Sequence, residues 1–136
     1  MPKMIFVNLP VKDLPAATAF YKAIGCEQNM QFSDENASSM MWSDTIVFML
    51  LKREFYSTFT AKPIADAHAV SAHLISLSFD RREDVDAIVE AAKAAGGKAD
   101  AQPPQDYGFM YTRDFEDLDG NDFGPVWMNP EAVQAT

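Results

Sequence analysis

The two histidines are the side chains best suited to hold a metal ion, and both lie near the middle of the chain. His68 and His73 are five residues apart and close to Asp66. That spacing suits neither one face of a helix nor one face of a strand. We therefore interpret both as solvated loop residues. A metal site that involves His73 or His68 remains the alternative.

A run of acidic residues near the C-terminal end could also attract a cation. It contains Asp114, Glu116, Asp117, Asp119 and Asp122. A calcium loop needs oxygen ligands in a defined order around a glycine, and this run lacks that order. We expect a solvated turn between two strands.

Arg113 is the best candidate to hold an anionic group, because a guanidinium binds carboxylate or phosphate through two parallel hydrogen bonds. The segment around it also carries Tyr107 and Tyr111, and we expect these three side chains at the rim of a binding site. A salt bridge between Arg113 and one of the neighbouring acids is the alternative. The sequence contains no Ser-His-Asp arrangement, phosphate-binding loop or dinucleotide fingerprint.

A strand that runs into a capped helix opens the chain. Residues 4–9 have the aliphatic and β-branched composition of a buried strand, which Pro10 ends. Asp13 is a good N-cap for the helix that follows, and Gly25 can end it in a left-handed conformation. Strands are predicted next at 28–32, 38–42 and 45–51.

The second half repeats this order after a long connecting segment. A strand is predicted at 74–79, followed by a helix with a capping box at residues 80–83 and a stop at Gly96 and Gly97. Further strands are predicted at 98–101, 109–115 and 121–128. The connecting segment could be a plain linker or a lid.

Two βαβββ modules in succession predict an α+β fold. We expect module 1–54, a connecting loop at 55–71, module 72–130 and a short tail at 131–136. Each module would leave one face of its sheet free of helices. Together they would form a curved eight-stranded mixed sheet with helices outside and a ligand-binding cup within.

Composition limits the class of partner. The formal net charge of −9 argues against nucleic acid or an anionic membrane, because both bind basic surfaces. Cys26 is the single cysteine, which excludes an internal disulfide and fits a reducing cytoplasm. Its place after Gly25 favours a small buried residue over a nucleophile. No apolar run reaches the length of about 18 residues that spans a membrane.

The chain resembles the vicinal oxygen chelate superfamily, which includes glyoxalase I, bleomycin-resistance proteins and extradiol dioxygenases. The similarity lies in residues 9–14 with the Phe20-Tyr21 pair, in strand 74–79 with residues 95–97, and in the Asp117-Leu-Asp-Gly120 turn. It spans nearly the whole chain. The resemblance implies the glyoxalase/bleomycin-resistance fold and a homodimer.

Metal-dependent members of this family hold a divalent ion with His, Glu or Gln side chains on four strands. Judged from the helix caps and the final turn, the matching positions here are Phe6, strand 46–50, Leu74 and Gly124. None of them offers a ligating side chain, so we predict no metal and no cofactor. A shift of one register would bring His73 to the third position, but it would also turn the apolar residues of its strand into the cup.

The strands of the cup still offer groups for a small molecule. We expect Phe6, Asn8, Ser76, Ser78 and Gly124 to face it. Phe48 and Leu50 would add apolar walls, or Val47 and Met49 in the other register. The short polar groups would orient a ligand through hydrogen bonds, or would form a hydrated floor without one.

The leading functional hypothesis is a metal-free protein that binds a small, partly apolar molecule in this cup, as bleomycin-resistance proteins bind drugs. The first alternative is an enzyme, a lyase, isomerase or dioxygenase of glyoxalase type with a relocated metal. The second is a protein-interaction module whose cup is closed by aromatic packing.

Overall fold

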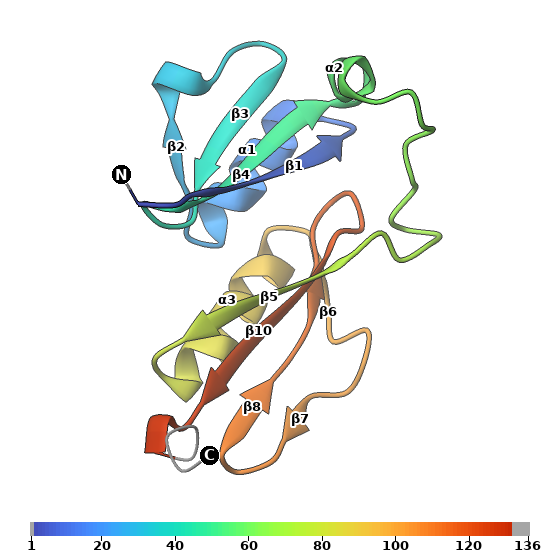
Figure 1. Cartoon of the computed structure of the whole chain (residues 1–136). Helices are drawn as coiled ribbons and strands as arrows, with labels where there is room; N and C mark the ends of the chain where they lie inside the picture. The colour runs from blue at the N-terminus through green and yellow to red at the C-terminus, as the bar shows by residue number, and fades with distance from the viewer. Residues whose placement is uncertain (1, 132–136) are drawn as a thin grey trace. The chain divides into compact units, whose positions relative to one another are not determined.

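The computed structural model describes residues 2–131, which form two compact units, one ending at Asp66 and the other beginning at Ala67. In each unit a long helix packs on a sheet (Figure 1). The α+β class with helices outside curled sheets is therefore confirmed. The boundary between the units falls inside the expected connecting loop 55–71.

The first unit contains a four-stranded sheet in the order β1-β4-β3-β2, with β1 and β4 parallel and the other pairs antiparallel. Its elements are β1 (Ile5–Val11), α1 (Leu14–Ala23), β2 (Glu27–Asn29), η1 (Met30–Phe32), β3 (Ala37–Met41), β4 (Ile46–Lys52), α2 (Arg53–Tyr56) and η2 (Ser57–Phe59). The strand expected at 28–32 ends early. The Asn29 side chain accepts a hydrogen bond from the Gln31 amide there and caps the short η1 turn. The loop expected from residue 55 begins instead with the helical turns α2 and η2.

The helix signals of the first unit are confirmed. The Asp13 carboxylate accepts a hydrogen bond from the Ala16 amide 3.1 Å away, and Gly25 has a φ of 112°. Cys26 is buried, and burial raises the pKa of its thiol to about 12. A thiol with that pKa stays protonated at neutral pH, which agrees with a packing role.

The second unit contains β5 (Leu74–Phe79), α3 (Arg82–Ala94), β6 (Lys98–Ala99), β7 (Gln105–Asp106), β8 (Met110–Thr112), β9 (Phe115–Glu116) and β10 (Asp122–Met128). Strand β10 pairs in parallel with β5 and antiparallel with both β8 and β9. In turn β7 pairs with β8 and β6 with β9. If β8 with β9 and β6 with β7 are each counted as one interrupted strand, the order repeats that of the first unit. The predicted duplication of βαβββ modules is therefore visible in the topology.

Two expectations for the second unit are wrong. The strand expected at 109–115 is broken at Arg113 and Asp114. The capping box at residues 80–83 does not form, because the N-cap of α3 is Arg81, which makes no side-chain capping bond. Glu83 pairs with the Arg81 guanidinium at 2.8 Å instead of reaching back to the backbone. Of the tail predicted at 131–136, only Glu131 lies within the described residues.

Alternation along each strand separates a helix face from an open face. In the first unit the helix face is the core, with Leu9, Val11, Phe48 and Leu50 each at most 1% exposed. The open face carries the residues between them. In the second unit Leu77 is buried, whereas Leu74, Ser76 and Ser78 are exposed on the open face. No helix among the described residues is both long and apolar enough to cross a membrane.

Candidate functional site

The open face of the first unit contains a cavity of about 440 Å³, which we call the Phe6 cavity. Strands β1 and β4 supply its floor, because their parallel register brings Phe6 beside Val47 and Asn8 beside Met49. The short η1 turn supplies Phe32. The cavity is lined by Met4, Phe6, Asn8, Asn29, Phe32, Ser39, Met41, Val47 and Met49. The structure therefore places Phe6 and Asn8 together in this cavity.

Phe48 and Leu50 do not face this cavity. Both are almost fully buried on the helix face, where the Phe48 ring lies 5.8 Å from the ring of Tyr21. Their assignment to the binding site is corrected to the alternative register, in which Val47 and Met49 line it. Sequence reasoning missed Asn29 and Phe32, because the turn that presents them was predicted as a strand.

Asn8 is one of three polar residues that line the cavity, together with Asn29 and Ser39. Its side chain makes no hydrogen bond to any of the described residues, so its amide and carbonyl groups are both available to a ligand. Phe6 and Phe32, which flank it, are 56% and 63% exposed. The cavity thus combines apolar walls with an unsatisfied carboxamide, as small-molecule sites usually do.

The open face of the second unit has a shallower pocket of about 250 Å³. Ser76 and Gly124 lie side by side in it through the parallel β5–β10 register. The Ser76 Oγ is 3.6 Å from the place where a Cβ on Gly124 would lie. Ser78 is on the same face farther along β5, opposite Val126. All three therefore lie on the open face of the second unit.

The strand positions at which the resemblance implies ligands for a divalent ion carry no ligating side chain here. They are occupied by Phe6, by Val47 and Met49 of β4, by Leu74 and by Gly124. Among residues 2–131, no three His, Cys, Asp or Glu side chains gather as a metal ion requires. The residues present therefore do not fit the divalent ion of this family.

The two histidines lie beside a pocket of about 180 Å³ in the second unit. The His68 Nε2 is 3.2 Å from the Leu118 carbonyl oxygen. The His73 Nδ1 is buried without a hydrogen-bond partner in the described structure. Asp122 lines the same pocket, and burial together with the nearby Asp114 and Glu116 carboxylates raises its pKa. This pair of histidines is not joined by the acidic groups into a metal site.

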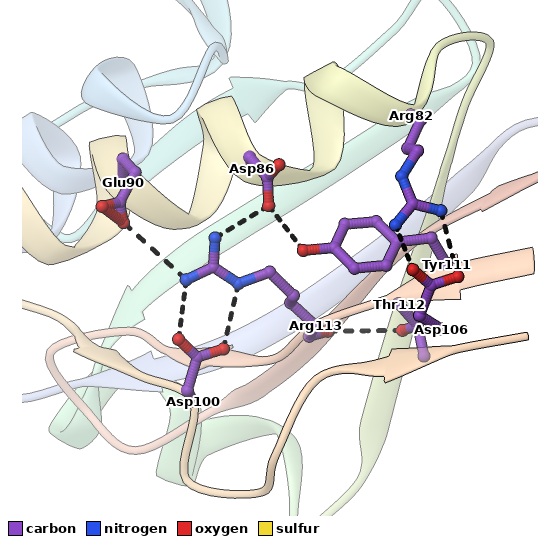
Figure 2. A network of polar contacts seen from close by, with 8 residues as sticks. All are labelled: Arg82, Asp86, Glu90, Asp100, Asp106, Tyr111, Thr112 and Arg113. Carbon is purple, nitrogen blue, oxygen red and sulfur yellow. Dashed lines mark hydrogen bonds and ion pairs between the residues drawn. The ribbon is translucent and has the colours of Figure 1, made fainter. Parts of the chain in front are cut away.

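Arg113 forms salt bridges with acidic side chains of the second unit (Figure 2). Its guanidinium donates to both Asp100 carboxylate oxygens, at 3.1 and 2.6 Å, and to Asp86 at 2.9 Å. Glu90 lies 3.8 Å away. These bonds raise the Arg113 pKa further, the Asp100 bond most. The salt-bridge alternative is thus the one that the structure shows, and a role for Arg113 in binding an anion is not supported.

Tyr111 belongs to the same network. Its hydroxyl donates to Asp86 at 2.7 Å, and the Arg82 guanidinium lies 4.0 Å above its ring (Figure 2). Arg82 in turn pairs with Asp106. Tyr107 is 55% exposed beside Phe109 and does not join the network. Tyr111 therefore links β8 to α3, and we no longer place it at the rim of a ligand site.

Comparison with known proteins identifies the class to which a chain with this fold belongs. The model of the Glyoxalase/Bleomycin resistance protein/Dioxygenase superfamily matches residues 3–124. The chain therefore belongs to this superfamily. No curated protein sequence matches it.

Several solved structures share this fold. A hypothetical protein from S. aureus is 26% identical, with a TM-score of 0.77 over 93% of this chain and 94% of that one. A glyoxalase/bleomycin resistance protein/dioxygenase family enzyme from Burkholderia phytofirmans PsJN is 19% identical, with a TM-score of 0.76 over 93% and 99%. The fosfomycin resistance protein FosX from Mesorhizobium loti is 14% identical, with a TM-score of 0.70 over 98% of each chain.

Proposed function

We propose that this protein binds a small, partly apolar molecule in the Phe6 cavity and does so without a metal ion. The observation that carries the proposal is the cavity itself. Its volume of about 440 Å³ lies in the range of small-molecule sites, and its lining is apolar apart from Asn8, Asn29 and Ser39. Residues without ligating groups occupy the positions where relatives hold an ion.

The exposure of the cavity walls supports the same proposal. Phe6 and Phe32 are more than half exposed, and Met4 is 40% exposed. Covering apolar surface stabilises a complex by about 25 cal/mol for each Å² removed from water. A ligand would bury these side chains, and the apolar part of that ligand would supply most of the affinity.

The superfamily offers a parallel, because it includes bleomycin resistance proteins. We propose that this chain sequesters its ligand in the same general way and that it forms a homodimer, as the resemblance implies. We also propose a cytoplasmic location, which the single, buried Cys26 supports.

The enzymatic alternative has one observation in its favour, the buried His73 Nδ1 without a partner. A lyase, isomerase or dioxygenase built on it would need further ligands. The described residues around His73 do not provide them. The interaction-module alternative requires a closed cup, whereas the Phe6 cavity is open. Both alternatives are therefore less well supported than binding.

Native mass spectrometry of protein purified without chelators tests the metal-free state and the dimer together. We expect the mass of two chains with no bound transition ion.

A thermal shift panel of metabolites and drugs tests binding, because a ligand of the folded state raises the melting temperature. Stabilisation should persist after treatment with a chelator and in His73→Ala. One tightly bound ion per chain, or stabilisation that the chelator abolishes, would overturn the proposal.

A further inference from the structure

A second cavity lies next to the Phe6 cavity on the open face of the first unit. Its volume is about 320 Å³, and it is lined by Asn8, Leu51, Tyr56, Phe59 and Thr60. We call it the Phe59 cavity. The helical turns α2 and η2 supply Tyr56 and Phe59, directly after β4 ends. This segment was predicted as a connecting loop, either a plain linker or a lid.

Asn8 lines both cavities. The two therefore adjoin along the β1 strand, with the Asn8 carboxamide at their junction. The Tyr56 hydroxyl, like Asn8, makes no hydrogen bond within residues 2–131. The Phe59 ring is 69% exposed, although the Phe55 ring contacts it edge-on at 5.1 Å between centroids. The junction thus offers uncharged hydrogen-bonding groups between two apolar surfaces.

The described residues that line the Phe6 and Phe59 cavities are all uncharged. No Lys, Arg, His, Asp or Glu appears among the described residues that line either cavity. An ionised group that leaves water for such a site loses its hydration and finds no opposite charge, whereas a neutral amide or hydroxyl is compensated by a hydrogen bond. The Arg82 and Arg113 guanidiniums and the carboxylates that they bind belong to the second unit.

From these observations we propose that the ligand is an uncharged, extended molecule with an aromatic ring, which occupies both cavities and hydrogen-bonds to Asn8 through a neutral amide, carbonyl or hydroxyl group. This inference rests on the proposed binding function and names its ligand class. It assigns Asn8 as the specificity-determining residue. It also assigns Tyr56 and Phe59 to the binding site.

Three probes of nearly the same shape test the charge. They are 2-naphthamide, which is neutral, 2-naphthoate, which is anionic, and 2-naphthamidine, which is cationic. Calorimetric titration should show 2-naphthamide binding at least about tenfold more tightly than either ion. About 0.5 M NaCl in the buffer screens the net charge of the protein, so that the difference reports the site.

Substitutions at the junction locate the binding. Asn8→Leu keeps the size of the side chain and suits a strand, and we expect it to weaken 2-naphthamide about tenfold by removing the hydrogen bonds. Asn8→Asp should reverse the preference in favour of 2-naphthamidine. Asn36→Asp, the same change in the first unit at a residue that lines neither cavity, is the matched control and should change nothing.

The second cavity is tested by Phe59→Ala, which should weaken 2-naphthamide several-fold. Phe109→Ala removes a similarly exposed ring in the second unit and should have no effect. Circular dichroism confirms that each variant is folded.

Equal or tighter binding of either ion by the unchanged protein would overturn the inference and leave the proposed function standing. If none of the three probes binds, the ligand class is wrong, and the thermal shift panel decides separately whether the protein binds small molecules.

Discussion

Gly120 packs closely against the backbone of Ala67 and His68. Its φ is +87°, and a Cβ placed on it would lie 2.6 Å from the His68 amide nitrogen and 2.7 Å from the Ala67 carbonyl carbon. Backbone atoms cannot move aside as the end of a flexible side chain can. Glycine is therefore required at this position both for its conformation and for the space it leaves.

Gly120→Ala should lower the free energy of unfolding by at least about 3 kcal/mol, because it adds a backbone clash to an unfavourable φ. Gly108→Ala is the matched control. Gly108 has a φ of +80° but nothing within 4 Å of the added Cβ, so only the conformational cost of about 1 kcal/mol remains. Urea unfolding of both variants measures the difference. Equal losses would mean that the Ala67–His68 backbone yields to the new methyl group.

Arg113 is a second residue whose role is local. Its side chain is 14% exposed, and it neutralises carboxylates of both α3 and the segment after β6 (Figure 2). The Tyr111 hydrogen bond, helped by Arg113, lowers the pKa of Asp86 below its usual 3.8. A lowered pKa in the folded state contributes stability above the unfolded pKa, and that stability is lost as the pH falls through the folded value.

Arg113→Met should cost about 1–2 kcal/mol at pH 7, an estimate kept low because Asp86 is half exposed. The difference in unfolding free energy between Arg113→Met and the unchanged protein should become smaller below about pH 4, because the acids become protonated in both proteins. Denaturant midpoints from pH 7 down to pH 3 measure it. Arg81→Met, which removes a fully exposed pair with Glu83, is the control and should leave the midpoint unchanged. A gap that stays constant with pH would assign the loss to packing alone.

At the scale of elements, the two long helices begin differently. The Asp13 side chain caps α1, whereas no side chain caps α3. Asp13→Ala should therefore cost about 1 kcal/mol of unfolding free energy. Asp80→Ala, at the residue that the sequence predicted as the second cap, should cost almost nothing. A thermal or urea melt of each decides, and a loss at Asp80 that matches the loss at Asp13 would restore the predicted capping box.

Much of this arrangement could be predicted from the sequence. Strand composition predicted β5 with its bounds. The resemblance to the superfamily implied that Phe6, Leu74 and Gly124 face the cup, and alternation along the strands added Asn8 and Ser76. The face of β4 could not be predicted, because Ile46–Lys52 is apolar on both faces and leaves no period of two. Burial of Phe48 against Tyr21 decides it, and that contact joins separate elements.

The acidic partners of Arg113 could not be predicted from the sequence either. Its neighbours in the chain include Asp114 and Glu116, yet its guanidinium bonds to Asp86 and Asp100, which are 27 and 13 residues away. Asp114 instead accepts hydrogen bonds from the Ala101 and Gln102 amides. Only the pairing of α3, β6 and β8 in the folded unit brings these groups together.

At the scale of the whole molecule, the same βαβββ module occurs twice, but the two copies differ in the continuity of their strands and in the polarity of their open faces. Both units keep the same strand order, with a parallel pair at one edge of the sheet. The first has continuous strands, and the described residues that line the two cavities of its open face are all uncharged. The second has interrupted outer strands and an open face with acids at its edge. We therefore expect the repeated topology to supply the scaffold and the first unit to supply most of the binding surface.

The division of each strand into a packed face and a solvent-facing one has an evolutionary consequence. Leu9 and Val11 are fixed by the interior, while Phe6 and Leu74, at 56% and 77% exposure, contribute little to it. Substitutions at the outward positions can therefore accumulate with little penalty to folding. The set of side chains that faces a ligand can therefore change at every second residue of a strand, without passing through an unstable intermediate.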